Sequence, residues 1–310
     1  MLKVLITCPP MLGMIDNFSN IFERHQVEIT APNVVQTLSE KELISLVPKH
    51  HGWIIGDDPA TRKVFEAGKM GSLIAAVKWG IGVDNVDFDA CNDLDIPVDN
   101  TPDMFGNEVA DVAMGYVIAL ARDTFIIDRA VRKGKWIKPK GISLSGKKVA
   151  LIGFGDIGKA TSKRLLAANM TVVAYDPVAD DNQDMPDVSR EVWPEGIKDA
   201  DFIVITSSLT KSSFHLLNED IFDKVKDGVR IINVGRGPII DEIALENALK
   251  NGKVTSAALD VFEKEPLPLD SYLREHPHCI FGSHNSSNTI DAVERTSIIA
   301  INKLFHFMKT

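Results

Sequence analysis

Short apolar runs rich in β-branched residues alternate with longer segments of helical periodicity over almost the whole chain. In the first third, the runs that we expect to form strands are residues 3–7, 27–30, 53–55 and 74–78. In the remainder, the expected strands are residues 148–152, 171–175, 202–206, 230–234, 256–259 and 279–281. Nearly continuous apolar strands that alternate with helices predict parallel sheets covered by helices on both faces. The pattern therefore predicts an α/β protein.

Helical segments fill the intervals between these strands. We expect helices around residues 16–24 and 39–47, and a longer one over 105–122. Ser39 is followed three residues later by Glu42, which is the pattern of a capping box at a helix N-terminus.

Two polar, turn-rich runs, residues 99–103 and 282–288, interrupt the alternation. The chain has 310 residues, about twice the usual length of one domain. If the chain crosses between two domains at these runs, residues 1–100 and 286–310 form one domain. Residues 101–285 then form a second domain, inserted into the first.

Composition narrows the class of protein. Hydrophobic residues make up 45% of the chain and charged residues 25%, as in ordinary globular proteins. The 34 basic and 43 acidic residues give a net charge of −9, which disfavours binding to nucleic acid or to anionic membranes. Three cysteines without a CxxC pair predict reduced thiols. The apolar N-terminal run is too short for a signal peptide, so we expect a cytoplasmic protein without a membrane segment.

A glycine-rich motif carries the first sign of function. A predicted strand runs directly into Gly153-Phe-Gly-Asp-Ile-Gly158, and a helix follows. Gly153 allows a tight turn, Gly155 lets a pyrophosphate approach the backbone, and Gly158 lets helix and strand pack closely. Asp176 ends the next strand, 23 residues after Gly153, where an acid binds the ribose hydroxyls of NAD and repels the 2′-phosphate of NADP. The motif predicts an NAD-binding Rossmann domain.

Three later segments, each directly after a predicted strand, carry Arg236, Glu265 and His284. The carboxyl ends of parallel strands meet at one edge of a sheet, so these side chains can reach one site. A guanidinium can bind a carboxylate, an imidazole can transfer a hydroxyl proton, and a carboxylate can orient the imidazole and favour its charged form. Such a set suits the oxidation of a 2-hydroxy acid. Each residue also has a structural interpretation: a hydrogen-bonded histidine, a loop-capping arginine and a glutamate in a surface turn.

From about residue 78 to residue 284 the chain resembles the D-isomer-specific 2-hydroxyacid dehydrogenases, phosphoglycerate dehydrogenase among them. The segments that carry this resemblance are, in order, 80–87, 100–102, 109–111, 134–136, the glycine loop, 176–177, 233–238, 260–266 and His284. The resemblance implies hydride transfer between nicotinamide and a D-2-hydroxy or 2-keto acid. It also implies a Rossmann-type dinucleotide-binding domain inserted into a flavodoxin-like substrate domain, and a homodimer formed through the NAD-binding domain.

The resemblance also implies roles for individual residues: His284 would be the acid/base, Glu265 would pair with it and tune it, and Arg236 would bind the substrate carboxylate. The residues implied in NAD binding are Gly153, Gly155, Asp156, Ile157, Gly158, Asp176, Ser207, Val234, Gly235, Arg236, Asp260 and His284. Those implied in substrate binding are Lys78, Gly80, Ile81, Gly82 and Arg236. No metal is implied. Where the family usually has small glycines after the histidine, this chain has the polar residues 285–287.

The substrate stays open at this point. Phosphoglycerate dehydrogenases tend to carry an arginine where this chain has Asp57 and Asp58. Two acids there disfavour a phosphate without excluding it, unless Lys78 or Arg62 compensates their charge. Lys78 and Trp79 either bring positive charge and bulk to the substrate, or Trp79 is core and Lys78 extends to solvent. One alternative is 3-phosphoglycerate dehydrogenase itself, and another is an NAD(H)-sensing protein of the corepressor type on the same fold. We expect no regulatory module after the last helix.

Overall fold

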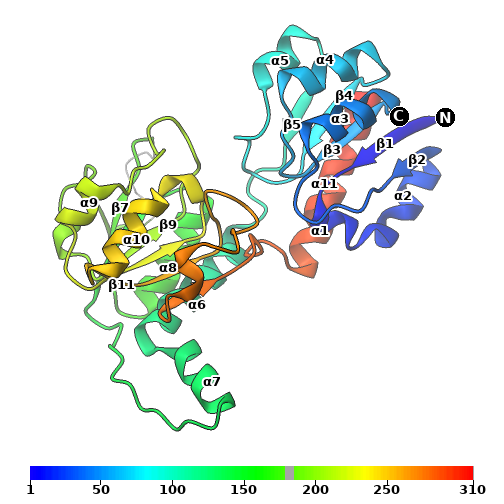
Figure 1. Cartoon of the computed structure of the whole chain (residues 1–310). Coiled ribbons are helices and arrows are strands. Elements are labelled where there is room, and N and C mark those ends of the chain that lie inside the picture. Colours follow the sequence, from blue (N-terminus) through cyan, green and yellow to red (C-terminus); the bar gives the residue numbers. More distant parts are fainter. Residues whose placement is uncertain (179–184, 310) are drawn as a thin grey trace. The chain divides into compact units, whose positions relative to one another are not determined.

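A computed structural model describes residues 1–178 and 185–309 of the chain (Figure 1). The chain divides into two compact units, Met1–Met104 with Asn288–Thr310, and Phe105–Ser287. The second unit is therefore inserted in sequence into the first, and the changeovers fall a few residues later than those expected from the sequence. In the described part of the chain, no helix has the length and apolar character needed to cross a membrane.

The first unit is built on a parallel sheet in the order β2-β1-β3-β4-β5. Its strands are β1 (Leu2–Ile6), β2 (Val27–Thr30), β3 (Gly52–Ile55), β4 (Ala75–Lys78) and β5 (Val98–Asn100). Every residue of β3 and β4 is buried, as expected for parallel strands covered on both faces. The strand order is that of flavodoxin-like sheets, so the predicted architecture of this unit is confirmed.

Helices from both ends of the chain cover this sheet. They are α1 (Pro9–Leu12), α2 (Ser19–Arg24), α3 (Glu40–Leu46), α4 (Arg62–Met70), α5 (Phe88–Asp93) and α11 (Ile290–Met308). The predicted capping box is confirmed: Ser39 Oγ accepts from the Glu42 N–H, and the Glu42 carboxylate accepts from the Ser39 N–H. The last helix, α11, packs against β3 and β4 (Figure 1). Lys303 on α11 binds Asp99 at 2.6 Å, which ties the C-terminal segment to β5.

The second unit contains a parallel sheet in the order β12-β11-β10-β9-β6-β7-β8. Its strands are β6 (Lys148–Ile152), β7 (Thr171–Tyr175), β8 (Val188–Arg190), β9 (Phe202–Ile205), β10 (Val229–Asn233), β11 (Val254–Leu259) and β12 (Cys279–Phe281). From β6 the chain first adds β7 and β8 on one side and then β9 to β12 on the other. The direction of growth therefore reverses between β6 and β9, which is where open α/β sheets bind ligands.

The helices of the second unit are α6 (Gly106–Arg122), α7 (Thr124–Arg132), α8 (Asp156–Ala167), α9 (Glu219–Lys224) and α10 (Glu242–Lys250). Short 3-10 turns of both units lie at Ile15–Phe18, Val47–Lys49, Ile197–Asp199, Gly237–Ile239 and Tyr272–Glu275. The helices α6 and α8 pack on each other over much of their length. Two strands, β5 and β8, have no counterpart among the predicted ones, because each contains only one apolar residue, Val98 in β5 and Val188 in β8. β5 also includes Asp99 and Asn100, which the sequence pattern assigned to a turn.

Candidate active site

The glycine loop joins β6 to α8 at the point where the sheet reverses its growth. Gly153 has a φ of +91°, and a Cβ at this residue would lie 2.6 Å from the backbone of Ser207, which follows β9. A Cβ at Gly158 would lie 2.3 Å from the carbonyl oxygen of Gly153. A Cβ at Gly155 would meet nothing within 4 Å, so this residue faces open space. The loop thus has the tight turn, the close packing and the open approach that a pyrophosphate needs.

Two further features of this loop fit a dinucleotide. Helix α8 begins at Asp156, and its N-cap residue Gly155 makes no side-chain hydrogen bond to the first N–H groups, which a phosphate can use. Asp156 lies in this first turn, and its carboxylate packs against Gly106: a Cβ at Gly106 would lie 2.3 Å from Asp156 Oδ1. Among the residues that the structure describes, the buried Ser207 Oγ has no hydrogen-bond partner. A bound cofactor would lie against the open glycine and would give hydrogen-bond partners to the N–H groups of the helix and to the buried hydroxyl.

Asp176 is held against the same loop at the end of β7. Its Oδ2 accepts from the Phe154 N–H at 2.7 Å, and its Oδ1 accepts from the Val178 N–H at 2.9 Å. The side chain is partly exposed, so ribose hydroxyls can approach it. The Arg190 guanidinium lies 4.3 Å above the Phe154 ring, so one positive charge also lies beside the loop. The fixed carboxylate is the group that would discriminate between NAD and NADP.

The three segments that carry Arg236, Glu265 and His284 follow β10, β11 and β12, which are neighbours in the sheet. A Cβ at Gly237 would fall 1.9 Å from the Phe262 carbonyl carbon, so the first two segments touch backbone to backbone and only glycine fits there. The geometry therefore brings the three predicted segments together at one edge of the sheet.

His284 and Glu265 form a direct pair. The distance between His284 Nδ1 and Glu265 Oε2 is 2.8 Å, and each side chain is 21% exposed. The other carboxylate oxygen, Glu265 Oε1, accepts from the Phe262 N–H at 3.0 Å, which fixes the carboxylate. His284 has a φ of +55° and donates its own N–H to the Asp260 carbonyl at 2.7 Å. Since Nδ1 faces the carboxylate, proton transfer to a substrate would fall to Nε2.

Asp260 anchors the loop that carries His284. Its buried carboxylate accepts from the Ser286 N–H at 2.9 Å, from the Asn285 N–H at 3.2 Å, and from Ser286 Oγ. Of these donors, only Ser286 Oγ belongs to a side chain that a glycine would lack. This anchoring role was not predicted, because it depends on a contact between residues 26 apart in sequence.

Tyr116 of α6 also reaches this region, and sequence reasoning missed it. A Cβ at Gly282 would lie 1.9 Å from Asp260 Oδ1 and 2.7 Å from the Tyr116 hydroxyl. Burial raises the pKa of Tyr116, and the Asp260 carboxylate raises it further, so the phenol stays neutral. A tyrosine inside an otherwise apolar helix gives no sequence signal for such a contact.

Arg236 lies in a loop that Asn233 holds. Asn233 Nδ2 donates to the Arg236 carbonyl at 2.9 Å, and Asn233 Oδ1 accepts from the Gly235 N–H at 3.0 Å. The Val234 N–H donates to Ile205 at 3.1 Å, which ties the loop to the end of β9. Asn233 was not predicted as a functional residue, although an asparagine at the end of a strand is a signal for such loop-forming hydrogen bonds.

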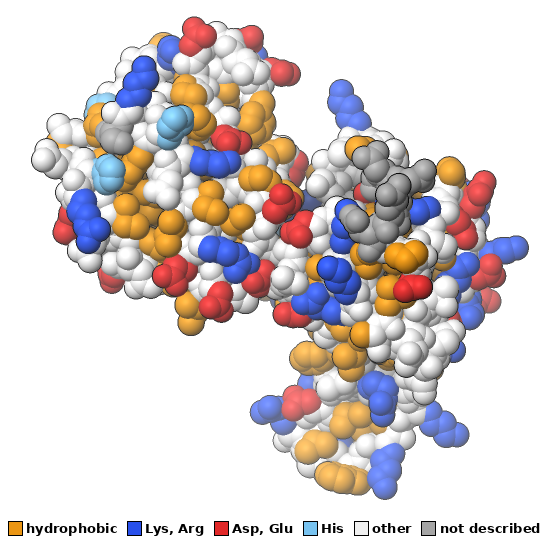
Figure 2. All heavy atoms as spheres, turned by 180° about the vertical axis from the view of Figure 1, so that it is seen from behind, with side chains coloured by type: hydrophobic (Ala, Val, Ile, Leu, Met, Phe, Trp, Pro, Cys, Tyr) orange, Lys and Arg blue, Asp and Glu red, His pale blue; other side chains and the backbone are white. Residues whose placement is uncertain are grey.

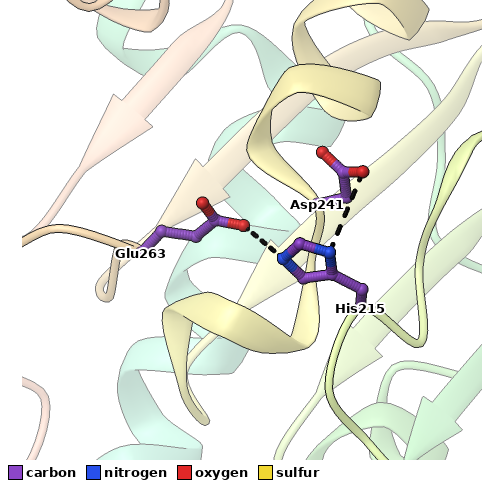
Figure 3. A group of neighbouring side chains, drawn as sticks. All are labelled: His215, Asp241 and Glu263. Atoms are coloured by element: carbon purple, nitrogen blue, oxygen red, sulfur yellow. Dashed lines mark hydrogen bonds and ion pairs between the residues drawn. The ribbon is translucent and has the colours of Figure 1, made fainter.

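A second histidine contacts the segment that leads to Glu265. Among the described residues, His215, Asp241 and Glu263 form a group that could hold a metal ion. The His215 Nε2 lies 2.7 Å from Glu263 Oε1, whereas Nδ1 lies 3.9 Å from Asp241 Oδ2 (Figure 3). The ring thus lies between the two carboxylates, with one nitrogen toward each. This is the geometry of an imidazole that links two loops, and it holds Glu263 two residues before Glu265.

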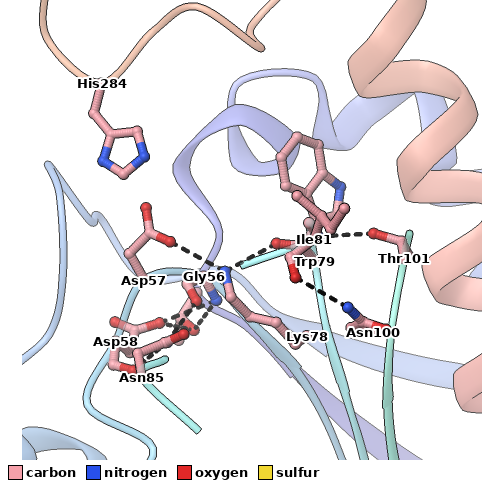
Figure 4. Close-up of polar contacts among 12 residues, drawn as sticks. Gly56, Asp57, Asp58, Lys78, Trp79, Ile81, Asn85, Asn100, Thr101 and His284 are labelled. Atoms are coloured by element: carbon pink, nitrogen blue, oxygen red, sulfur yellow. Dashed lines mark hydrogen bonds and ion pairs between the residues drawn. The ribbon is translucent and has the colours of Figure 1, made fainter. Parts of the chain in front are cut away.

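In the first unit, the residues predicted to bind substrate follow β4 (Figure 4). The Gly80 N–H donates to Thr101 Oγ1 at 2.7 Å, and Asn100 Nδ2 donates to the Ile81 carbonyl at 3.1 Å. Gly80 has a φ of +113°, which favours glycine. Because the Gly80 N–H is engaged, binding of a substrate carboxylate by this loop would fall to the N–H groups of Ile81 and Gly82.

The two interpretations of Lys78 and Trp79 are resolved in part. Trp79 is core, and its Nε1 donates to Ser297 Oγ at 3.1 Å. Lys78 is also buried, and its Nζ lies 3.0 Å from Asp57 Oδ1. The expectation that Lys78 extends to solvent is therefore wrong, because the Asp57 carboxylate compensates the burial of the ammonium group.

The three cysteines offer no reactive thiolate. Cys8, Cys91 and Cys279 are all free and buried. Burial raises the pKa of each thiol to about 12, so each stays protonated near neutral pH. Free, buried thiols agree with the predicted reduced state.

Comparison with known proteins gives the family. The family model described as "D-isomer specific 2-hydroxyacid dehydrogenase, NAD binding domain" matches residues 114–286. The hydroxypyruvate reductase of Thermotoga maritima is 36% identical over 291 residues, which are 92% of this chain and 92% of that protein. The D-3-phosphoglycerate dehydrogenase of Archaeoglobus fulgidus is 34% identical over 276 residues, but they span only 52% of that protein. The chain belongs to the D-isomer-specific 2-hydroxyacid dehydrogenases.

Solved structures support the same conclusion. The TT0316 protein of Thermus thermophilus has a TM-score of 0.88 and 27% identity, with 99% of this chain and 97% of that one covered. The apo form of D-lactate dehydrogenase from Escherichia coli has a TM-score of 0.84 and 26% identity, with 100% and 97% covered. The predicted family and fold class are confirmed, and so is the prediction of an NAD-dependent dehydrogenase.

Proposed function

We propose that this enzyme interconverts a small 2-keto acid and a D-2-hydroxy acid, with His284 as acid/base, Glu265 as its orienting partner and Arg236 as the carboxylate ligand. The observation that carries the proposal is the 2.8 Å contact between Glu265 and His284. This pair lies at the carboxyl ends of strands in the sheet that also carries the glycine loop and Asp176.

In the direction of reduction, bound NADH supplies a hydride to the keto carbon. Arg236 binds the carboxylate and draws electron density from the adjacent carbonyl, so the carbon becomes a better hydride acceptor. His284 donates the proton from Nε2 to the oxygen as negative charge develops there. Glu265 keeps the ring oriented and stabilises its protonated form before transfer. In oxidation, the same nitrogen accepts the hydroxyl proton.

For residues of the first unit, we propose contacts with the substrate carboxylate. The N–H groups of Ile81 and Gly82 bind the substrate carboxylate, while the Gly80 N–H keeps its bond to Thr101 and fixes the loop. Lys78 acts through Asp57, with which it forms an ion pair. We also propose that Asp260 supports the nicotinamide through the His284 loop that it anchors.

The experiment that tests this function is a panel of 2-keto acids with NADH, followed by the absorbance of NADH. Turnover of at least one small 2-keto acid is expected. If NADH binds but no keto acid is reduced, the proposal is contradicted. NADH-dependent capture of a protein partner without turnover would instead support the alternative of an NAD(H)-sensing protein.

The Asp176→Asn variant is expected to lose much of the preference for NADH over NADPH. Removing the charge beside the 2′-position lifts the repulsion of a phosphate, and the ratio of kcat/KM for the two cofactors should fall at least about tenfold. Asparagine keeps the acceptor for the Phe154 N–H. As a control, Asp220→Asn on the exposed face of α9 should leave the ratio unchanged. An unchanged ratio in Asp176→Asn would show that another group selects the cofactor.

A homodimer formed through the NAD-binding unit is the second part of the proposal. Helix α7 has no buried residue, although it carries the apolar Phe125 and Val131. Trp136, just after this helix, is 81% exposed. Figure 2 shows apolar side chains gathered with basic ones over this part of the chain, at the foot of the view. Exposed apolar side chains on and just after one helix are typical of a surface that a partner covers.

The variant Trp136→Glu combined with Val131→Glu should therefore be monomeric. Charges in a buried apolar interface are strongly unfavourable. Size-exclusion chromatography with light scattering would measure the mass. The matched control is Met70→Glu in the first unit, where Met70 is 84% exposed, and it should remain dimeric. A wild-type protein that is monomeric at high concentration would contradict the proposal.

A further inference from the structure

The sheet of the first unit has its own topological switch point. In the order β2-β1-β3-β4-β5, growth of the sheet reverses between β1 and β3. Open parallel sheets bind ligands at the carboxyl ends of the strands at such a point. The two strand ends touch there: a Cβ at Gly56 would lie 2.8 Å from the Thr7 carbonyl oxygen. Asp57 and Asp58 follow immediately, so two carboxylates lie where a ligand is expected.

The structure separates these two acids. Asp58 is fully buried and accepts from the Leu38 N–H at 2.7 Å, from the Gly56 N–H at 3.2 Å, and from Thr7 Oγ1. Burial raises the pKa of Asp58, and these hydrogen bonds act in the opposite direction. Asp58 therefore joins the ends of β1 and β3 to the segment before α3, and its role is structural.

Asp57 is the exposed member of an ion pair. Its side chain is 39% exposed, whereas that of Lys78 is 3% exposed. The Lys78 ammonium also donates to the Trp79 carbonyl at 3.0 Å, so the protein already uses two of its three N–H donors (Figure 4). Asn85 Nδ2 donates to the Gly56 carbonyl at 3.1 Å and fixes the backbone before Asp57. The pair has no net charge, but its ammonium end is buried and its exposed end is the carboxylate, so a ligand meets the negative end first.

This carboxylate lies one strand away from the loop of residues 80–82. The Trp79 N–H donates to the Ile55 carbonyl at 2.9 Å, so the chain after β4 continues beside the chain after β3. Neighbouring strands lie about 4.8 Å apart. Asp57 and the loop of residues 80–82 therefore follow neighbouring strands at the same edge of the sheet.

We infer that Asp57 selects a 2-keto acid with a hydroxyl group on C3, such as hydroxypyruvate, and disfavours one that carries a phosphate or a second carboxylate there. This inference rests on the proposed function, in which the loop of residues 80–82 binds the substrate carboxylate. A hydroxyl donates a hydrogen bond to the carboxylate, a methyl group leaves that contact unmade, and an anion is repelled. Hydrogen bonds to a charged acceptor correspond to about tenfold to a hundredfold in affinity.

The first test compares kcat/KM for hydroxypyruvate, pyruvate and 3-phosphohydroxypyruvate with NADH. The wild-type enzyme should prefer hydroxypyruvate to each of the others by at least about tenfold. In Asp57→Asn, the ratio of hydroxypyruvate to pyruvate should fall by about tenfold, and the ratio within one variant corrects for any loss of active protein. Asp16→Asn, an equal change of charge at an exposed residue of the same unit, should leave this ratio unchanged.

A second variant keeps the test decisive if Asp57→Asn does not fold. Asp57→Asn leaves the buried Lys78 ammonium without its anion, which destabilises a folded protein. The double variant Asp57→Asn Lys78→Met removes both charges and roughly keeps the side-chain volume, and thermal unfolding measures whether it is folded. Calorimetric titration of the NADH complex with D-glycerate and D-lactate gives a readout without turnover. The wild type should bind D-glycerate about tenfold more tightly than D-lactate. The double variant should bind the two about equally.

Three results would overturn the inference while the proposed function stands. The first is an equal kcat/KM of the wild type for pyruvate and hydroxypyruvate, and the second is a higher kcat/KM for 3-phosphohydroxypyruvate. The third is a preference for hydroxypyruvate over pyruvate that persists in both Asp57 variants. If NADH binds but none of the keto acids is reduced, the proposed function fails, and this inference fails with it.

Discussion

His284→Ala is expected to lower kcat for keto-acid reduction by about a hundredfold to ten-thousandfold, while NADH still binds. The imidazole is the group held by Glu265 at 2.8 Å, and alanine removes the proton donor without adding bulk. Steady-state kinetics would measure kcat, and fluorescence titration would measure the dissociation constant of NADH. A loss confined to kcat would assign the role to proton transfer.

The control for this substitution is His278→Ala, which removes an exposed histidine of the same unit. It should have nearly wild-type kinetics. Full activity of His284→Ala would refute the proposed acid/base. An equal loss of activity in both variants would point to a general effect on the fold.

Arg236→Lys is expected to lower kcat/KM by about a hundredfold, although the charge is retained. A lysine ammonium cannot present the two parallel N–H donors with which a guanidinium binds a carboxylate. The carbonyl next to that carboxylate also loses its polarising partner, so KM should rise and kcat should fall together. Kinetics with the best substrate of the keto-acid panel would measure both.

Chemical rescue distinguishes a missing group from a distorted loop. Added guanidinium should restore part of the activity of Arg236→Ala, because Asn233 still holds the loop through backbone atoms. Arg122→Lys, an exposed arginine in the last turn of α6, is the matched control and should be unaffected. Wild-type kcat/KM in Arg236→Lys would exclude a bidentate carboxylate contact.

Much of the fold was predictable because most of the parallel strands in this chain are apolar over nearly their whole length. β7 and β12 were predicted to the residue, since each is a largely apolar run bounded by polar or turn residues. β5 and β8 were missed because each contains a single apolar residue, which establishes no pattern. Their pairing depends on the neighbouring strand: Val98 pairs with Ala76 and Val188 with Val172. Edge strands of this kind are determined by tertiary contacts.

Site residues that follow a strand could be predicted from the sequence. Residues whose role depends on a contact with a residue far away in the sequence could not. Arg236, Glu265 and His284 follow neighbouring strands, so topology alone brings them to one edge. The sequence did not show that the Asp58 side chain is buried and the Asp57 side chain is exposed. Two adjacent acids cannot be told apart until their hydrogen-bond donors are known.

We expect this chain to transfer a hydride from NADH to a 2-keto acid to give the D-2-hydroxy acid. The most direct measurement incubates the wild-type protein with NADH and hydroxypyruvate, follows the loss of NADH, and determines the configuration of the product by chiral chromatography. We expect one molecule of D-glycerate for each NADH consumed. Formation of L-glycerate, or binding of NADH without any oxidation, would contradict it.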